Sequence, residues 1–552
     1  MSRKIEMSKL LMGQMMEQPL LLSDILLHAK KHHADTEIVS RRTEGDIHRY
    51  TYADCELRAR KVAQTLERLG INPGERVGTL AWNGYRHMEL YYGISGSGLV
   101  CHTINPRLFQ EQISYIVNHA DDKAIFFDIT FLSLIEKIKP VCPNVANWIC
   151  MIDESKMPAS NTADLLCYEE LINAEDGNYE WPTFDERAAS ALCYTSGTTG
   201  NPKGALYSHR STVLHSYAST MPDSISISNL DSVMPVVPMF HVNAWGLPYS
   251  CALVGAKIVF PGAKLDGASI YELMEKEGVT MSAGVPTIWA GLLKYVTENN
   301  LSFSTFNRTL IGGSSCPPAM MEGFQKLGVK VVHAWGMTEL SPLGTIAGLK
   351  SKDLHKSKAA QQLILQKQGR SLFGIDMKIV DGDKKSLPHD GKAFGDLMVK
   401  GGWVINRYFR SDESPLFDGW FPTGDVATID PDGNMQITDR SKDVIKSGGE
   451  WISSIDIENI ATAHPKVFMA ACISTPHPKW DERPLLVIVK KPDCGEDDAI
   501  LKLDILNFFE GKIAKWWIPD EVVFIPEMPF TATGKLYKLK LREMVKDYLP
   551  VQ

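Results

Sequence analysis

The chain contains 552 residues, of which 44% are hydrophobic and 22% charged, and its formal net charge at pH 7 is -8. A chain of this length exceeds what one hydrophobic core organises, so we expect at least two domains. The composition is typical of a soluble globular protein, and the negative charge disfavours non-specific binding to nucleic acid or to an anionic membrane surface.

The cysteine spacing and the N-terminal segment indicate where the protein works. The 10 cysteines include no CxxC pair, which favours reduced thiols and a cytoplasmic protein over a disulfide framework. Charged residues interrupt the first 22 positions, so these predict neither a signal peptide nor a membrane span. No run of about 18 apolar residues occurs elsewhere, and we expect no integral membrane segment.

Apolar periodicity predicts alternating helices and strands in the first part of the chain. Helical spacing predicts helices over 22–31 and 52–69, the second capped by Thr51, and a further helix begins near Tyr85. Short apolar runs predict strands at 76–81, 100–104, 123–127 and 145–152. The mostly polar segment 158–179 is expected to be a connection. Such alternation predicts an α/β fold.

A loop rich in hydroxyls and glycines runs from Tyr194 to Gly204, directly after the apolar-leaning segment 188–193. Glycines allow a ligand to approach the backbone, and successive amides and hydroxyls can surround phosphate oxygens. A solvated linker is the alternative, but the preceding strand and the charge of Lys203 argue against it. A Walker loop is excluded because it requires Gly before the Lys, and Pro202 stands there.

This loop resembles the phosphate-binding signature of the adenylate-forming superfamily, which includes acyl-CoA synthetases, luciferases and peptide-synthetase adenylation domains. Further motifs of the superfamily follow in the same order over nearly the whole chain, and the resemblance is greatest to bacterial-type fatty-acyl-CoA and methylmercaptopropionate-CoA ligases. It implies ATP, Mg²⁺ and coenzyme A as cofactors or co-substrates. The loop residues that it implies for nucleotide binding are Thr195, Ser196, Gly197, Thr198, Thr199, Gly200 and Lys203.

One histidine and one tryptophan stand in an apolar segment between proline breaks at 235–246. By itself such a histidine is more often a core residue. The resemblance implies instead that His241 acts at the junction of the acyl pocket and the nucleotide site, and that Trp245 gates the acyl tunnel. An indole has a large apolar ring and one hydrogen-bond donor, so it can serve as a movable barrier. Peptide-synthetase domains place an amine-binding Asp where His241 stands, so a substrate amine has no evident counter-ion here.

Two motifs near the middle of the chain complete the implied nucleotide site. In the superfamily the segment 310–317 covers adenine and part of the acyl wall, which implies Gly313 and Ser314 for the nucleotide and Gly313 for the acid. Alone, it would be ordinary turn chemistry. The motif 331–339 implies nucleotide contacts by His333, Ala334, Trp335, Gly336 and Thr338.

The same motif contains the implied metal ligand. Glu339 would bind Mg²⁺ that bridges the ATP phosphates, since this cation prefers carboxylate and phosphate oxygens, and Thr195 would complete the metal site. Thr338 would contact the α-phosphate. Trp335 stands where the superfamily commonly has Tyr, so it could stack on adenine but lacks the phenol hydroxyl. A strand ending in a polar turn is the alternative interpretation.

A β-rich region is expected after a polar helix at 356–368, from the strand-like segments 373–380 and 395–400 and the turn between them. Asp425 follows a turn and matches the Asp that accepts both ribose hydroxyls, for which a carboxylate has two acceptor oxygens. An Asp that caps the turn is the alternative.

The charged, glycine-containing motif 439–453 is expected to be the domain boundary, although elsewhere it would suggest a solvated hairpin. The resemblance makes Asp439 the hinge between an N-terminal domain, 1–438, and a C-terminal domain, 439–552. The residues implied for nucleotide or CoA contact are Arg440, Lys442, Lys446, Gly448, Gly449, Glu450 and Trp451.

Lys535, after Gly534 near the end of the chain, matches the catalytic lysine of the adenylation step. A compact ammonium can bridge the acid's carboxylate and the α-phosphate oxygens as charge develops between them. It would act only when the C-terminal domain has rotated toward the nucleotide.

These motifs together predict a large α/β N-terminal domain of layered helices and sheets with a β-rich subdomain, followed by a small mobile α+β domain. The implied enzyme is an ATP-dependent acyl-CoA ligase that adenylates a short- to long-chain aliphatic acid, and a homodimer is expected from the subgroup. A luciferase-like or carrier-protein-acylating enzyme is an alternative, although no carrier domain follows Gln552. A degenerate ligand-binding homologue is another, against which Glu339, Asp425 and Lys535 argue.

Overall fold

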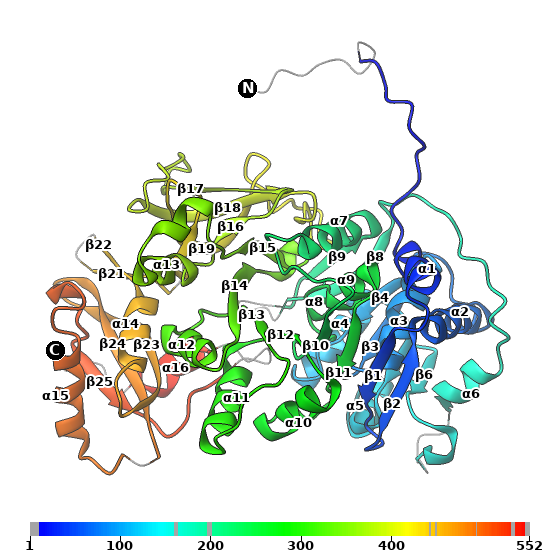
Figure 1. The fold of residues 1–552 in the computed structure, drawn as a ribbon, viewed down its shortest axis with the longest axis horizontal. Coiled ribbons are helices and arrows are strands. Elements are labelled where there is room, and N and C mark those ends of the chain that lie inside the picture. Colours follow the sequence, from blue (N-terminus) through cyan, green and yellow to red (C-terminus); the bar gives the residue numbers. More distant parts are fainter. Residues whose placement is uncertain are drawn as a thin grey trace.

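The computed structural model describes residues 10–158, 164–195, 201–440, 443–447, 450–492, 494–530 and 536–546, with the backbone alone for 450 and 451. The described strands form four sheets. Figure 1 shows the first two sheets at the right and centre, the third above the centre, and the fourth at the left with the C-terminal helices. The predicted α/β class is confirmed.

The first sheet has the strand order β7-β6-β5-β3-β4-β8-β9, and neighbouring strands are parallel except for β8 and β9. Its strands are β3 (Arg76–Leu80), β4 (Val100–Thr103), β5 (Asp122–Phe127), β6 (Asn147–Cys150), β7 (Leu165–Cys167), β8 (Ala189–Tyr194) and β9 (Gly204–Ser208). The antiparallel pair β8 and β9 flanks the predicted phosphate-binding loop, with Tyr194 opposite Gly204.

The second sheet has the order β16-β15-β14-β13-β12-β10-β11-β1-β2, with a parallel centre and antiparallel strands at both edges. Its strands are β1 (Glu37–Arg41), β2 (Ile47–Thr51), β10 (Ser232–Pro235), β11 (Lys257–Phe260), β12 (Met281–Gly284), β13 (Arg308–Ile311), β14 (Lys330–Gly336), β15 (Leu343–Ile346) and β16 (Arg370–Ser371).

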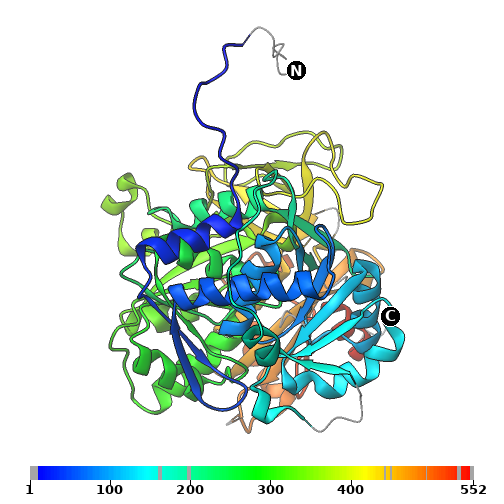
Figure 2. The same cartoon turned by 90° about the vertical axis from the view of Figure 1, so that its right-hand side faces the viewer.

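A layer of helices fills the space between these two sheets, because residues of both sheets and of these helices share one hydrophobic cluster. The layer consists of α1 (Leu22–His32), α2 (Tyr52–Arg68), α3 (Tyr85–Gly96), α7 (His209–Thr220) and α9 (Leu247–Val254). Figure 2 shows α1 and α2 side by side across one face. The cap predicted for α2 is confirmed, since the Thr51 hydroxyl accepts from the Asp54 amide and the Asp54 carboxylate accepts from the Thr51 amide.

Other helices cover the outer faces. The first sheet is covered by α4 (Gln110–Ala120) and α5 (Leu132–Ile138), and the second by α10 (Gly267–Glu277), α11 (Pro286–Glu298) and α12 (Pro318–Lys326). The resulting arrangement of alternating helix and sheet layers buries both faces of the parallel strands, as such strands require.

The third sheet is an antiparallel meander that packs against β8 and β9 in one hydrophobic cluster. Its strands are β17 (Ile375–Val380), β18 (Phe394–Gly401), β19 (Phe421–Ile429) and β20 (Met435–Arg440), and α13 (Lys358–Leu365) precedes it. The predicted β-rich region is confirmed. Asp425 lies inside β19, however, and not just past a turn.

The fourth sheet follows directly, so the change of sheet falls between Arg440 and Ile445. Its strands are β21 (Ile445–Ser447), β22 (Glu450–Ile452), β23 (Val467–His477), β24 (Asp481–Lys490) and β25 (Glu521–Phe524), with helices α14 (Ser454–Thr462), α15 (Asp498–Phe508) and α16 (Lys538–Met544). Separate hydrophobic clusters lie on its two faces.

One segment differs from the sequence-based expectation. The mostly polar stretch 158–179, expected to be a connection, contains β7 and α6 (Tyr168–Asn173). Tyr168 and Ile172 are buried in the central cluster, and Tyr168 donates to Glu89 at 2.5 Å. The short helix α6 buries only three side chains, which are too few to produce a recognisable helical periodicity in the sequence.

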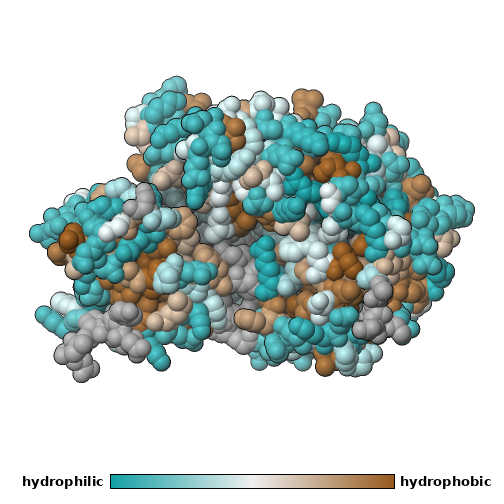
Figure 3. Space-filling model, turned by 90° about the horizontal axis from the view of Figure 1, so that it is seen from below, coloured by the Kyte–Doolittle hydropathy of each residue, from teal (hydrophilic) through white to brown (hydrophobic). Residues whose placement is uncertain are grey.

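The surface is mixed in character. Seen from below, hydrophilic residues alternate with smaller hydrophobic patches on both the C-terminal part and the main body (Figure 3). None of the described helices combines the length and the apolar composition needed to cross a bilayer.

Candidate active site

A cavity of about 340 Å³ lies at the carboxyl ends of parallel strands from the first two sheets. Residues that directly follow β4, β8, β10, β12 and β13 line it, which is where open α/β sheets bind ligands. One part of its lining is apolar and consists of Ile225, Val236, Val237, Pro238, Leu265, Val285, Ile288 and Leu310.

The remaining lining contains many residues that the sequence motifs predicted. They are Thr195, Lys203, His241, Trp245, Gly313, Ala334, Trp335, Gly336, Thr338, Glu339, Asp425 and Arg440. Motifs separated by more than 200 positions in the chain thus meet around one cavity that has both polar and apolar lining residues.

Other predicted residues lie elsewhere or cannot be placed. Those outside the described residues are Ser196, Gly197, Thr198, Thr199, Gly200, Lys442, Gly448, Gly449 and Lys535. Glu450 and Trp451 belong to β22, of which only the backbone is described there. Ser314 is exposed and Lys446 is exposed on β21, and neither lines the cavity.

Thr195 and Lys203 bring together the two ends of the predicted phosphate-binding loop. The Thr195 amide donates to the Lys203 carbonyl at 2.9 Å, and the Lys203 amide approaches the Thr195 hydroxyl at 3.4 Å. The Lys203 ammonium lies 5.2 Å from the centre of the Tyr408 ring. This places one hydroxyl and one positive charge at the neck of the loop, where an anion would be stabilised.

Glu339 presents a mostly buried carboxylate to the cavity, with 7% of the residue exposed. The Tyr408 hydroxyl donates to Glu339 Oε1 at 2.7 Å, and burial together with the Glu339 charge raises the pKa of Tyr408. The neighbouring Thr338 is held by Tyr207, whose hydroxyl donates to the Thr338 carbonyl at 2.6 Å. A carboxylate that lines the same cavity as Thr195 and Lys203 fits Mg²⁺, which takes one or two carboxylates and completes its shell with phosphates and water.

Asp425 has an ion-pair partner at one carboxylate oxygen and a hydrogen-bond donor at the other. Arg440 Nε lies 2.9 Å from Oδ1, and the Trp335 indole nitrogen donates to Oδ2 at 2.9 Å. Asp425 and Arg440 face each other on β19 and β20, so strand register sets this pair. The carboxylate is 4% exposed and keeps free lone pairs for two hydroxyl donors.

His241 directly precedes a left-handed turn, α8 (Val242–Trp245), and Trp245 is its last residue. Its four residues have φ values of 47°, 50°, 50° and 56°, a conformation that costs L-residues about 1–2 kcal/mol each. Asn243 anchors the turn, since its buried side-chain oxygen accepts from Thr103 Oγ1 at 3.4 Å and from Cys193 Sγ at 3.3 Å. Because Cys193 lies two residues before Thr195, the turn is tied to the strand that enters the phosphate-binding loop.

The turn presents the Trp245 ring to a glycine pair. An added Cβ would lie 3.4 Å from the ring at Gly312 and 3.7 Å from it at Gly313, where φ is +79°. Glycine therefore allows the indole to lie against the backbone of the loop that follows β13.

His333 is buried beside the site without lining the cavity. Its Nε2 accepts from the Cys316 amide at 3.4 Å, and its Nδ1 donates to the Gln366 carbonyl at 2.9 Å. Burial lowers the pKa of His333 to about 4. These contacts connect β14 to its neighbouring loops, and any nucleotide contact at this position remains a prediction.

Tyr408 and Arg107 are two of the residues at the site that were not predicted. Tyr408 comes from a loop without a distinctive pattern and reaches Glu339 only through the tertiary fold. Arg107 lines the cavity with its guanidinium 5.6 Å from the Phe240 ring, and burial lowers its pKa. The position of Arg107 just past the carboxyl end of β4 was a signal that could have identified it.

Two family models match consecutive parts of the chain. The AMP-binding enzyme model matches residues 26–409, and the model of the AMP-binding enzyme C-terminal domain matches residues 456–535. The chain belongs to the AMP-binding enzyme family.

Curated relatives match this family member over almost its full length. It is 53% identical to the 3-methylmercaptopropionyl-CoA ligase of Ruegeria lacuscaerulensis, over 98% of this chain and 100% of the relative. It is 49% identical to the medium-chain-fatty-acid–CoA ligase of Ectopseudomonas oleovorans, over 98% of each chain. A crystal structure of an anthranilate CoA ligase with anthranoyl-AMP shares the fold, with a TM-score of 0.86 at 23% identity over 96% of this chain and 99% of the other.

Proposed function

We propose that this family member is an ATP-dependent acyl-CoA ligase for short- to long-chain aliphatic carboxylic acids. In the first half-reaction a carboxylate oxygen of the acid attacks the α-phosphorus of ATP, giving an acyl-adenylate and pyrophosphate. In the second, the CoA thiol attacks the acyl carbon, the C–O bond to AMP breaks, and the products are acyl-CoA, AMP and a proton. The supporting observation is one cavity lined in part by Thr195, Lys203 and Asp425 and in part by aliphatic side chains, in a chain 53% identical to a CoA ligase.

The residues around the cavity have distinct roles in this proposal. Thr195 and Lys203 hold the phosphates, Thr338 contacts the α-phosphate, and Asp425 accepts the ribose hydroxyls while the ring of Trp335 lies on adenine. Glu339 would hold Mg²⁺, which when bound neutralises phosphate charge. Most of the rate enhancement then comes from holding two anionic reactants together in a site where opposing charges are already in place.

The apolar part of the lining takes the acyl chain, with His241 and Trp245 at its boundary with the nucleotide. Lys535 arrives from the C-terminal domain for adenylation and leaves when that domain rotates about Asp439. A homodimer formed through the large domain and a cytoplasmic location also belong to the proposal.

Two assays test the proposed activity. Acid-dependent exchange of pyrophosphate into ATP reports adenylation, and CoA-dependent AMP release over a panel of straight-chain and thioether acids reports the complete reaction. We expect both activities with at least one aliphatic acid. Exchange without any CoA-dependent AMP release would identify a different acid-adenylating enzyme, and the absence of exchange with every acid would contradict the proposal.

A further inference from the structure

The apolar wall of the cavity includes a short segment that has left its sheet. Val236, Val237 and Pro238 line the cavity directly after β10 ends at Pro235. Beyond the last strand pairing, the backbone amides and carbonyls of such a segment need other partners, because unpaired buried groups are costly. We call residues 235–239 the wall segment.

The side chain of Asn83 supplies most of these partners. Its Nδ2 donates to the Pro235 carbonyl at 2.8 Å and to the Val237 carbonyl at 2.9 Å, and its Oδ1 accepts from the Met239 amide at 2.7 Å. Asn83 is 5% exposed. A single amide thus engages three alternate backbone groups of the wall segment, using two donors and one acceptor.

Two further contacts complete the fixation of the segment. The Tyr91 hydroxyl donates to the Met239 carbonyl, and the Val236 and Val237 amides both donate to the Ala283 carbonyl at 3.1 and 3.0 Å. The wall segment is therefore held on one side by its own sheet and on the other by Asn83 and Tyr91, which belong to the β3–α3 region of the first sheet.

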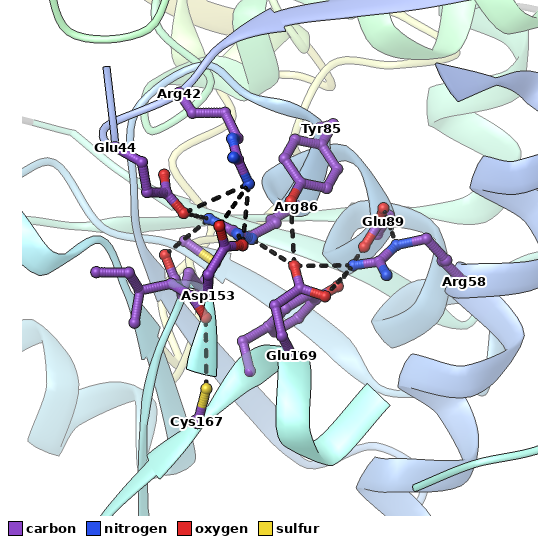
Figure 4. Close-up of polar contacts among 12 residues, drawn as sticks. Arg42, Glu44, Arg58, Tyr85, Arg86, Glu89, Asp153, Cys167 and Glu169 are labelled. Carbon is purple, nitrogen blue, oxygen red and sulfur yellow. Dashed lines mark hydrogen bonds and ion pairs between the residues drawn. The ribbon is translucent and has the colours of Figure 1, made fainter. Parts of the chain in front are cut away.

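A cluster of mostly buried charged side chains holds the start of α3, which begins two residues after Asn83 (Figure 4). Arg86, three residues after Asn83, bonds Glu44 at 2.7 Å, Asp153 at 2.8 Å and Glu169 at 2.7 Å. Arg58 on α2 joins Glu169 to Glu89 of α3, at 3.0 and 2.7 Å.

The cluster also links separate parts of the fold, since Glu44 follows β1 of the second sheet and Asp153 follows β6 of the first. Removing one member of such a buried ion pair leaves an uncompensated charge. The cluster therefore holds the β3–α3 loop in one position relative to both sheets, and through Asn83 it determines where the wall segment lies.

We propose that Asn83 is a positioning residue that sets the acyl pocket of the ligase and thereby its selectivity among acids, an inference that rests on the proposed function. Asn83 touches neither reactant. It acts through the wall segment, whose backbone it holds so that Val236, Val237 and Pro238 define the space for the acyl chain. Asp425 is held by Trp335 and Arg440, and Glu339 by Tyr408, all of which lie outside the wall segment, so we expect both carboxylates to keep their geometry when the segment shifts.

Two substitutions at Asn83 separate this role from simple packing. Asn83→Asp keeps the shape and the acceptor for the Met239 amide, but turns the two donated bonds into repulsion between a carboxylate and two carbonyls. Asn83→Ala leaves all three backbone groups without the amide. We expect Asn83→Asp to raise the KM for the preferred acid about tenfold and to change the ranking of kcat/KM across acids of increasing length, with the KM for ATP within about twofold of the parent value.

Tyr52→Phe is the matched control. It removes a buried hydrogen bond from α2, in the same helical layer, to the Ala256 carbonyl at 2.8 Å, and it involves neither the charged cluster nor the wall segment. We expect it to lower the unfolding temperature while leaving the ranking of acids unchanged. If an Asn83 variant does not fold, Tyr91→Phe tests the same segment, because it removes only the bond to the Met239 carbonyl and should move acid selectivity in the same direction with a smaller amplitude.

The measurements are steady-state AMP release with CoA for acids from propanoate to decanoate, and thermal unfolding of each variant. Folded variants at Asn83 and Tyr91 with an unchanged acid ranking would overturn the inference, and so would equal increases in the KM for acid and for ATP. If the parent protein released no AMP with any acid and CoA, the proposed function would fail, an outcome distinct from an unchanged ranking in an active parent.

Discussion

Trp335 occupies a position where the resemblance led us to expect a tyrosine, and the structure gives its indole a definite partner. The ring nitrogen donates to Asp425 at 2.9 Å, and Arg440 bonds the other carboxylate oxygen at the same distance. Without these donors a carboxylate that is 4% exposed would be poorly compensated. The indole thus orients the carboxylate to which we assign the ribose, as well as offering a flat face to adenine.

Trp335→Phe keeps an aromatic ring and removes the donor. Because a hydrogen bond to a charged group contributes about 1.5–3 kcal/mol, we expect the KM for ATP to rise about tenfold or more, with little change in the KM for the acid. The measurement is acid-dependent pyrophosphate exchange at varied ATP. Trp181→Phe is the control, since it removes an indole donor to Glu56 outside the cavity. An increase confined to the KM for the acid would contradict our assignment of Asp425 to ribose.

At the scale of single elements, the turn α8 has a strained backbone and lies at the candidate site. The left-handed turn α8 places four successive non-glycine residues at positive φ, and tertiary contacts through Asn243 maintain it. Residues in such conformations persist only where their surroundings over-determine them. The turn sits between the residue that we place at the acyl–nucleotide junction, His241, and the indole of Trp245.

Two substitutions at Asn243 separate the backbone strain from the side-chain bonds. Asn243→Ala loses the acceptor for Thr103 and Cys193 and also disfavours positive φ, so we expect it to destabilise the fold by about 2–4 kcal/mol. Asn243→Gly loses the same acceptor but accepts positive φ freely, so it should be the more stable variant by about 1 kcal/mol. Denaturant unfolding measures both. Equal stability of the two variants would show that the left-handed conformation is not a significant cost.

Periodic elements could be predicted from the sequence, and elements that depend on remote partners could not. The spacing in α2 and its Thr51 cap, and the apolar runs of β3 to β6, predict their elements within a few residues. The helix α6 was missed because its few buried residues meet α2 and α3 only in the fold. The turn at α8 has no local signal, since Asn243 is held there by residues about 50 and 140 positions away.

Site residues divide in the same way. Motifs with a fixed order of hydroxyls, glycines and charges indicated Thr195, Glu339 and Asp425, which line one cavity. Tyr408 acts through one hydrogen bond to a distant carboxylate, and Asn83 through three hydrogen bonds to a distant backbone segment. No local pattern distinguishes either residue from other polar residues.

At the scale of the whole molecule, buried neutral histidines make the fold sensitive to acid. Burial lowers the pKa to about 4 for His87, His209, His215 and His333. In the unfolded chain these groups titrate near 6.5, so between about pH 6.5 and 4 the unfolded state binds more protons and stability falls as the pH falls. Asp128 acts in the opposite sense, because burial raises its pKa to about 7 and the folded state binds its proton first.

His333→Gln tests this balance. We expect the stability of the variant to depend less steeply on pH between 6 and 4.5 than that of the parent, by about 1.4 kcal/mol per pH unit, because one proton no longer distinguishes the two states. Asp128→Asn should have the opposite effect on the slope. Thermal or denaturant unfolding at several pH values measures both slopes. Parallel curves for His333→Gln and the parent would show that protonation of this histidine is not coupled to unfolding.

In our proposal a lysine of the C-terminal domain reaches the cavity only for adenylation, and this determines what the loss of that lysine should do. On either side of the stretch that contains Lys535, Phe530 bridges to Leu536, and Lys538 on α16 is paired with Glu458 on α14 at 2.7 Å. In the proposed rotation about Asp439, Lys535 would move with this part of the chain.

Lys535→Ala should abolish adenylation, by a factor of about 10³ or more, because the charge that builds between the carboxylate and the α-phosphate then has no ammonium to bridge it. The same variant should convert supplied acyl-adenylate and CoA into acyl-CoA at close to the parent rate, because in our proposal the lysine has left the site by that step. Pyrophosphate exchange and single-turnover thioester formation measure the two half-reactions separately. Lys540→Ala is the matched control, an exposed lysine on α16 paired with Glu543, and should affect neither. Equal loss of both half-reactions in Lys535→Ala would contradict a rotating C-terminal domain and favour a lysine that stays at the cavity throughout.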